Sequence, residues 1–143
     1  MAAGAVAGHR ASIRGAEPVT WVPRFAFRIG GDPLPKERPR ATGQRAFTPK
    51  RTRDAEQRVL AAFRAAYPEA EPLAGRLLVD LKFFRRTRRG CDWDNLAKLP
   101  LDALNKVAYL DDEQIQKATV ERFYGAGDEA RTEVRIYEKD SPA

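Results

Sequence analysis

The sequence predicts an α+β fold, a small mixed or antiparallel sheet packed with two helices in the order β-α-β-α-β-β. Short segments in which apolar and polar residues alternate indicate strands, and two longer segments with apolar residues every three or four positions indicate helices. Glycine- and proline-containing breaks separate these segments. With 143 residues, 43% of them hydrophobic, the chain suits one domain with a modest core.

The first strand is expected over residues 22–29, where Phe25, Phe27 and Ile29 alternate with arginine and alanine. The sequence 30–33 ends it, and residues 34–48 are expected to form a long basic loop. Thr48 and Pro49 have the residue types of a helix N-cap and first helical position, which predicts a helix to about residue 67. Its apolar face would contain Ala55, Val59, Ala62, Phe63 and Ala66.

A second strand is expected over 76–84, and a second helix over 94–107. At ~100° per residue the helix divides cleanly into two faces. The polar face carries Asp94, Asn95, Lys98, Asp102, Asn105 and Lys106, and is expected to face a cleft. Asp94 is the expected N-cap, whereas Pro100 should kink the helix or move its regular start to near Leu99. Residues 116–124 and 131–138 follow as two strands expected to form a hairpin.

The ends of the chain are expected to lie outside the domain, with a flexible N-terminal extension over 1–22, the domain over 23–139 and a C-terminal tail over 140–143. The extension does not resemble a secretory signal, and no apolar run approaches the ~20 residues that span a membrane, so a cytoplasmic location is expected. A single cysteine excludes an intramolecular disulfide, and a single histidine provides no zinc site.

Positive charge is concentrated in two segments of a chain whose net charge is +6, which indicates a polyanionic partner. Residues 36–53 hold seven lysines and arginines against one acidic residue, and residues 85–89 hold four arginines. Either segment could be no more than a solvated loop, but the second directly precedes an acidic motif. The candidate nucleic-acid contacts are Lys36, Arg38, Arg40, Arg85, Arg86, Arg88 and Arg89.

Residues 91–115 contain five aspartates, which is unexpected in a chain that attracts polyanions. Carboxylates there can hold a divalent cation against a phosphate, so the run indicates a metal-dependent nuclease that hydrolyses phosphodiesters with metal-activated water. A calcium-binding EF-hand does not fit, because Leu96, Ala97 and Ala103 stand where it needs an oxygen ligand, glycine and glutamate. A non-catalytic nucleic-acid-binding protein would fit the basic loops but leave the aspartates unexplained.

Three blocks of this run together resemble a known signature. They are Asp92-x-Asp94-Asn95-x-x-Lys98, Asp102-Ala-Leu-Asn105 and Asp111-Asp112-x-Gln114-Ile115. In this order and spacing they are similar to the RusA family of Holliday-junction resolvases of bacteria and their phages. The resemblance extends over roughly residues 24–138 and includes the basic, proline-rich segment 33–40.

The resemblance implies that Asp92, Asp94 and Asp112 hold Mg²⁺, with Mn²⁺ as a possible substitute, and that Lys98 is needed for cleavage. It also implies a homodimer that makes paired nicks in a four-way DNA junction during recombination and repair, in a bacterial cell or a phage-infected host. No membrane and no small-molecule cofactor is expected. A general Mg²⁺-dependent nuclease without selectivity for junctions is the enzymatic alternative.

Several neighbouring residues have two possible roles. Asn95 is expected to orient a metal ligand, or else to cap the helix. Asp102 could pair with Lys98 four positions earlier or be an exposed charge, and Asp111 could support the ligand Asp112 or be a turn residue. Trp93 is expected in the core more than on an unpaired base. The downstream aspartates can reach the beginning of the helix only if the strand after Gln114 lies beside the strand ending near Phe84.

Overall fold

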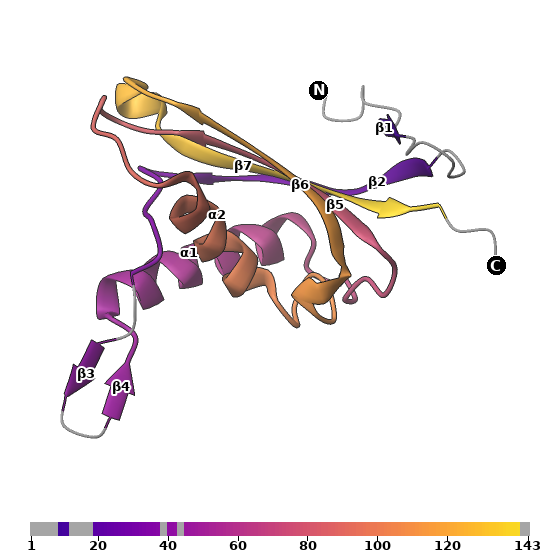
Figure 1. Ribbon diagram of the computed structural model, residues 1–143, viewed down its shortest axis with the longest axis horizontal. Coiled ribbons are helices and arrows are strands. Elements are labelled where there is room, and N and C mark those ends of the chain that lie inside the picture. Colours follow the sequence, from indigo (N-terminus) through magenta and orange to yellow (C-terminus); the bar gives the residue numbers. More distant parts are fainter. Residues whose placement is uncertain (1–8, 12–18, 38–39, 43–44, 141–143) are drawn as a thin grey trace.

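Two helices cover one face of a five-stranded sheet (Figure 1). This computed structural model describes residues 9–11, 19–37, 40–42 and 45–140, with side chains for 19–37 and 48–140. The sheet order is β1 (His9–Ala11), β2 (Val19–Gly30), β7 (Arg131–Lys139), β5 (Leu77–Phe84) and β6 (Ile115–Phe123). The pair β5 and β6 is parallel and the other pairs are antiparallel. The predicted α+β class and the order of its six main elements are confirmed.

The described part of the N-terminal extension joins this sheet. β2 begins at Val19, three residues before the predicted start, and β1 pairs with its first residues. The backbone N–H of Asp140 donates to the Thr20 carbonyl at 2.8 Å, which ties the end of the domain to the same region. The domain boundary near residue 22 stays a prediction. No helix in the described part of the chain is long and apolar enough to cross a membrane.

The predicted hairpin of the last two strands is wrong. β7 lies between β2 and β5, whereas β6 pairs with β5 and occupies the edge of the sheet. Burial explains the exchange, because β7 has Val134 and Ile136 buried toward the helices and Tyr137 buried on the opposite face. No residue of β7 is exposed, as expected of a strand that has a neighbour on each side. β6 is mostly exposed and suits an edge.

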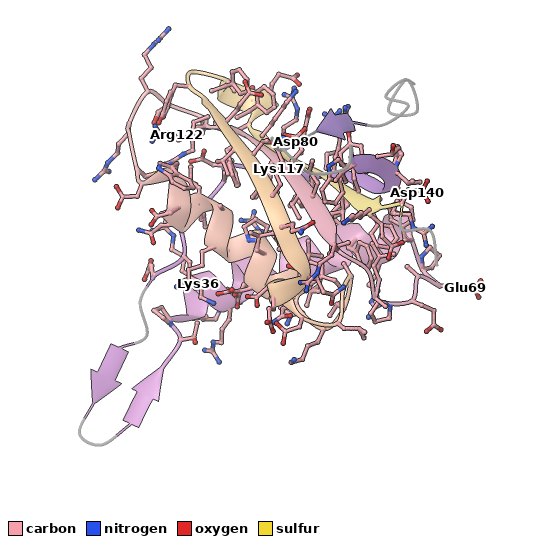
Figure 2. All side chains as sticks on the ribbon, turned by 45° about the vertical axis from the view of Figure 1, so that its right-hand side comes forward. Lys36, Glu69, Asp80, Lys117, Arg122 and Asp140 are labelled. Atoms are coloured by element: carbon pink, nitrogen blue, oxygen red, sulfur yellow. The ribbon has the colours of Figure 1, made fainter. Side chains whose placement is uncertain are left out.

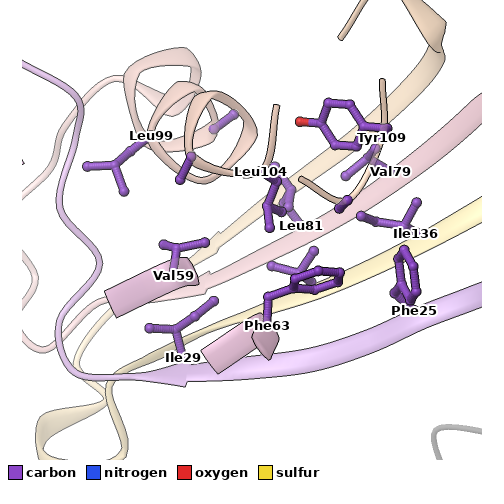
Figure 3. Packing of buried hydrophobic residues seen from close by; sticks show 14 of the residues in the cluster. Phe25, Ile29, Val59, Phe63, Val79, Leu81, Leu99, Leu104, Tyr109 and Ile136 are labelled. Atoms are coloured by element: carbon purple, nitrogen blue, oxygen red, sulfur yellow. The ribbon is translucent and has the colours of Figure 1, made fainter. Parts of the chain in front are cut away.

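Helix α1 (Lys50–Ala66) starts two residues after the predicted N-cap Thr48, and the loop before it contains the short pair β3 (Arg40–Thr42) and β4 (Arg45–Phe47). Its predicted apolar face is buried at three positions, partly buried at Ala62 and exposed at Ala66. The ring of Phe63 meets that of Phe25 edge-on with centroids 5.0 Å apart. Figure 3 shows Val59 and Phe63 of this helix in the core cluster that also contains Phe25, Ile29 and Leu81.

Helix α2 (Trp93–Leu104) begins one residue earlier than predicted and ends three residues earlier. Pro100 lies inside the helix and packs into the core, so it does not move the helix start. At the carboxyl end the Asn105 N–H turns back to the Asp102 carbonyl, and the Leu101 carbonyl accepts a hydrogen bond from Tyr109 instead. Burial raises the pKa of Tyr109, with the nearby charges of Asp112 and Asp102 adding to the effect. The phenol therefore stays protonated and closes the helix end.

Candidate active site

The positions of the site residues follow from how β5, β6 and α2 run relative to one another. Phe84 at the end of β5 lies opposite Phe123 at the end of β6, and Leu77 lies opposite Ile115 at their beginnings. The loop after β5 leads directly into α2. The Arg122 guanidinium donates to the Cys91 carbonyl at 2.7 Å and holds the start of α2 at the carboxyl end of β6. α2 therefore begins at one end of the strand pair.

Two exposed carboxylates stand at this beginning of α2. Asp92, and not Asp94 as predicted, occupies the N-cap position, but its side chain accepts no capping bond. Asp94 lies in the first turn. The Asn95 side-chain amide donates to Asp92 Oδ2 at 3.4 Å and the Asn95 N–H donates to Asp94 Oδ1 at 2.9 Å. Asn95 thus touches both carboxylates, as an orienting residue would, although that role stays a prediction.

Lys98 lies one turn beyond Asp94 and is exposed. It lines a groove of about 460 Å³ between α2 and β6, together with Lys36, Glu37, Trp93, Asp94, Asn95, Ala97, Leu101, Ala118 and Val120. The polar face of α2 borders a groove, as the periodicity predicts. Within the part of the chain with described side chains, Lys98 has no ion-pair partner. Its ammonium is therefore available to a bound phosphate.

The predicted partner of Lys98 is engaged elsewhere. Asp102 pairs with Lys36 at 2.8 Å, and Lys36 also pairs with Glu56 of α1 at 3.0 Å (Figure 2 labels Lys36). Burial alone would lower the pKa of Lys36, but its bonds to Asp102 and Glu56 outweigh burial and raise it. The backbone N–H of Lys36 donates to the Asn95 carbonyl at 2.9 Å. Lys36, a predicted DNA contact, thus joins its loop to both helices.

Asp111 and Asp112 lie at the other end of the strand pair, in a 3₁₀ turn before β6. Asp111 accepts from the Glu113 N–H at 3.0 Å, while the Gln114 side chain accepts from the Asp111 N–H at 2.7 Å. The Glu113 N–H lowers the pKa of Asp111, and the bond shared with Asp111 raises the pKa of Asp112. Asp111 therefore caps this turn and also shares a bond with Asp112, so its role in supporting a metal ligand stays a prediction.

The three predicted metal ligands do not meet in one chain. The strand after Gln114 does lie beside β5, as required, but it starts opposite Leu77 and so leaves Asp112 far from Asp92. α2 alone, with 12 residues, separates them by about 18 Å. Among the described residues, no three histidine, cysteine, aspartate or glutamate side chains are grouped so as to hold a metal ion. One chain supplies Asp92 and Asp94 in one place and Asp112 in another.

The four predicted DNA-contacting arginines of the loop 85–89 divide into three groups. Arg85 is 8% exposed, donates to the Cys91 sulfur and pairs with Asp32 at 3.6 Å, so it stabilises the loop from inside. Arg86 is exposed and pairs with Asp128 at 3.3 Å. Arg88 and Arg89 are exposed in the same loop, just before Asp92. Arg38 lies outside the described residues, and Arg40 is described only as backbone of β3.

Three features of the site were wrong in, or missing from, the sequence-based prediction. Trp93 is 56% exposed instead of buried, because the first turn of α2 projects over the edge strand, beside Ala118, Val120 and Arg122. Nothing in the sequence indicated that Glu56 pairs with Lys36, because only the fold brings α1 next to the loop that carries Lys36. The sequence did contain an indication for Arg122, because it is a charged residue at a strand position that faces the helices, as Val120 does.

One family of known proteins matches most of the chain. The family model for the endodeoxyribonuclease RusA matches residues 30–137, from the end of β2 to β7, and includes both helices and all five aspartates of the acidic run. A search of the curated proteins gave no match. Because the family model covers most of the chain, this protein belongs to the RusA endodeoxyribonuclease family and is an endonuclease that acts on the phosphodiester bonds of DNA.

Proposed function

We propose that the protein is a Mg²⁺-dependent resolvase that makes paired nicks in four-way DNA junctions. The observation that supports this most is the pair of exposed carboxylates, Asp92 and Asp94, directly after the arginine-rich loop. Lys98 lies beside them and has no ion-pair partner among the described side chains. Anionic groups in a basic surface weaken phosphate binding unless a cation intervenes. Membership of an endodeoxyribonuclease family supplies the reaction class.

The chemistry of these side chains fits Mg²⁺, and Mn²⁺ as a substitute. Asp92 and Asp94 offer only oxygen donors, which hard divalent cations prefer. Both carboxylates are exposed, and Asn95 contacts one oxygen of each. A cation held there would neutralise the scissile phosphate and acidify a water molecule. The third predicted ligand, Asp112, lies at the other end of the β5–β6 strand pair.

We assign the missing ligand to a second copy of the chain. A homodimer has two equivalent sites, each of which can take Asp92 and Asp94 from one subunit and Asp112 from the other. The separation of these residues along β6 and α2 supports this arrangement over a site within one chain. Two sites related by symmetry would also suit the two opposing strands of a junction.

The other residues of the groove have roles that follow from their positions. Arg88 and Arg89 can bind phosphates beside the scissile one, because their guanidinium groups are exposed and close to Asp92 in the sequence. Trp93 offers an exposed ring to a base that is unpaired at the branch point. Lys98 places a positive charge on the same face of α2 as Asp94 and would stabilise the charge that develops on the phosphate.

The proposal is tested with a labelled four-way junction, the matching linear duplex and the single strand, each with Mg²⁺, Mn²⁺, Ca²⁺ or EDTA. We expect paired nicks in the junction only, with Mg²⁺ or Mn²⁺. Degradation of all three substrates would indicate a general nuclease. Tight binding without cleavage in any metal would contradict the enzyme and support a binding protein.

Lys98→Ala should lower the single-turnover cleavage rate about a hundredfold while changing junction affinity less than about threefold. A charge used mainly in the transition state gives this division between rate and binding. Rates at saturating enzyme and affinities in Ca²⁺ measure the two effects separately. Lys82→Ala, on the face of β5 away from the helices, is the control and should change neither. Equal losses in rate and affinity would make Lys98 an ordinary phosphate contact.

A further inference from the structure

Lys98 has an aspartate one helical turn away on each side. It lies four residues after Asp94 and four residues before Asp102, and all three belong to α2. Asp94 is part of the candidate metal site, whereas Asp102 lies toward the other end of the helix. Lys98 is exposed and, among the described side chains, forms an ion pair with neither aspartate. The position of its ammonium therefore depends on which carboxylate is free to attract it.

Asp102 is held by a cation from another part of the chain. The Lys36 ammonium lies 2.8 Å from Asp102 Oδ2 and 3.0 Å from Glu56 Oε2, and none of these three side chains is more than 30% exposed. The backbone of Lys36 is also fixed, because its N–H donates to the Asn95 carbonyl at 2.9 Å. Partial burial and two carboxylate partners make this a firmer arrangement than an ion pair on the helix surface between Lys98 and Asp102. Asp102 is thus engaged by Lys36 and not by Lys98.

The two lysines also share one groove. Lys36 and Lys98 both line the groove between α2 and β6, together with Asp94. An ammonium placed beside Asp102 would lie close to that of Lys36, and like charges repel. Asp94 has no ion-pair partner among the described side chains. The charges around Lys98 therefore direct its ammonium toward Asp94, where the phosphate would bind in the proposed reaction.

We propose that Lys36 is a positioning residue that acts on Lys98 through Asp102. By holding Asp102, Lys36 leaves the Lys98 ammonium free to meet the phosphate beside Asp94. Without Lys36, two carboxylates would lose their shared cation, and Asp102 would draw Lys98 away from the phosphate. This role needs no contact between Lys36 and DNA, in contrast to the role predicted from the sequence. The inference rests on the proposed part of Lys98 in cleavage, whereas the contacts of Lys36 do not.

A double-mutant cycle tests this coupling. Lys36→Met removes the ammonium and should lower the single-turnover rate of junction cleavage about fivefold, a modest effect because ion pairs near the surface are weak. In an Asp102→Asn background the same substitution should lower the rate less than twofold, because no carboxylate remains there to capture Lys98. Glu56→Gln is the matched control. It removes the other carboxylate bound to Lys36, and in that background Lys36→Met should still lower the rate about fivefold.

The salt dependence of junction binding separates this role from a phosphate contact. Loss of one phosphate contact reduces the slope of log affinity against log salt concentration by about 0.9. We expect Lys36→Met to leave this slope unchanged in EDTA. Arg88→Ala, in the exposed loop before Asp92, is the positive control and should reduce it. A reduced slope for Lys36→Met would overturn the positioning role.

The state of Lys98 can also be measured without DNA, metal or cleavage. Acetic anhydride acetylates a free amine faster than an amine held in an ion pair, and peptide mass spectrometry reports each lysine separately. Labelling of Lys98 should slow about twofold in Lys36→Met and recover when Asp102→Asn is added. Lys82, on the face of β5 away from the helices, is the internal reference. Thermal unfolding verifies that each variant is folded, and Lys36→Gln gives the same test if Lys36→Met is not.

The outcomes separate this inference from the proposed activity. Unchanged labelling of Lys98 in Lys36→Met, or an equal loss of cleavage in all three backgrounds, would overturn the inference. Junctions still cleaved by the wild-type protein would then leave the proposed function intact. The expected labelling in a protein that cleaves no junction in Mg²⁺ or Mn²⁺ would support the effect of Lys36 on Lys98 and contradict the function.

Discussion

Replacing Asp92 or Asp94 with asparagine is expected to lower junction cleavage at least a hundredfold while leaving the fold intact. An amide is a poor ligand for a hard cation, and loss of a direct ligand should exceed the 10–100-fold cost typical of losing an outer partner. Stability should be preserved because both carboxylates are exposed and Asp92 makes no capping bond. Near wild-type nicking by either variant would remove that residue from the site.

The same variants should bind the junction as well as wild type in EDTA, or several-fold more tightly. Without a cation each carboxylate repels the phosphate, and a unit charge at contact distance contributes about 1 kcal/mol even at the dielectric constant of water. Ca²⁺ should reduce the difference by filling the wild-type site. Asp140→Asn, an exposed carboxylate at the end of β7, is the control for the change in net charge. Weaker binding by well-folded variants in EDTA would contradict a metal site at Asp92 and Asp94.

Mixing two inactive variants should restore activity. Asp92→Asn and Asp112→Asn homodimers each have two damaged sites if the ligands come from different subunits. After subunit exchange, a heterodimer places both substitutions in one site and leaves the other intact. With half of the dimers mixed and one site active in each, nicking should recover to about a quarter of the wild-type rate. The products should be single nicks in place of paired ones.

A second mixture serves as the control for this recovery. Asp92→Asn and Asp94→Asn affect the same half of each site, so their heterodimer has no intact site and should stay inactive. Differently tagged subunits show whether exchange has occurred. If exchange is complete and the Asp92→Asn and Asp112→Asn mixture is inactive, then each site takes its ligands from one chain.

Local spacing predicted the elements well, but not their neighbours in the sheet. The alternation of Leu77, Val79 and Leu81 identified β5 because each strand needs one buried face. The position of β7 depended on its having no exposed residue along its length, which becomes visible only when the burial of all the strands is compared. The prediction paired β6 with β7 because they are consecutive in the sequence. In the structure β7 lies between β2 and β5.

The candidate site divides in the same way. Asp94 and Lys98 share one face of α2 because they are one turn apart, and this the sequence could predict. A pair with Lys98 was one of the two roles considered for Asp102 by the same local rule, but Asp102 pairs with Lys36, which lies 66 positions earlier in the sequence. The opposite positions of Asp92 and Asp112 depend on the parallel direction of β6. Local patterns do not encode that direction.

The exposed Trp93 gives the protein an optical reporter of its own. The only other tryptophan, Trp21, is 3% exposed and lies in the small cluster on the opposite face of the sheet. Emission from Trp93 should therefore occur at longer wavelength, be quenched by iodide and change when a cation or a DNA base arrives next to it. The emission of Trp93 can therefore be distinguished from that of Trp21 without an added fluorescent label. Ligand binding at the start of α2 can thus be followed in real time in the unmodified protein.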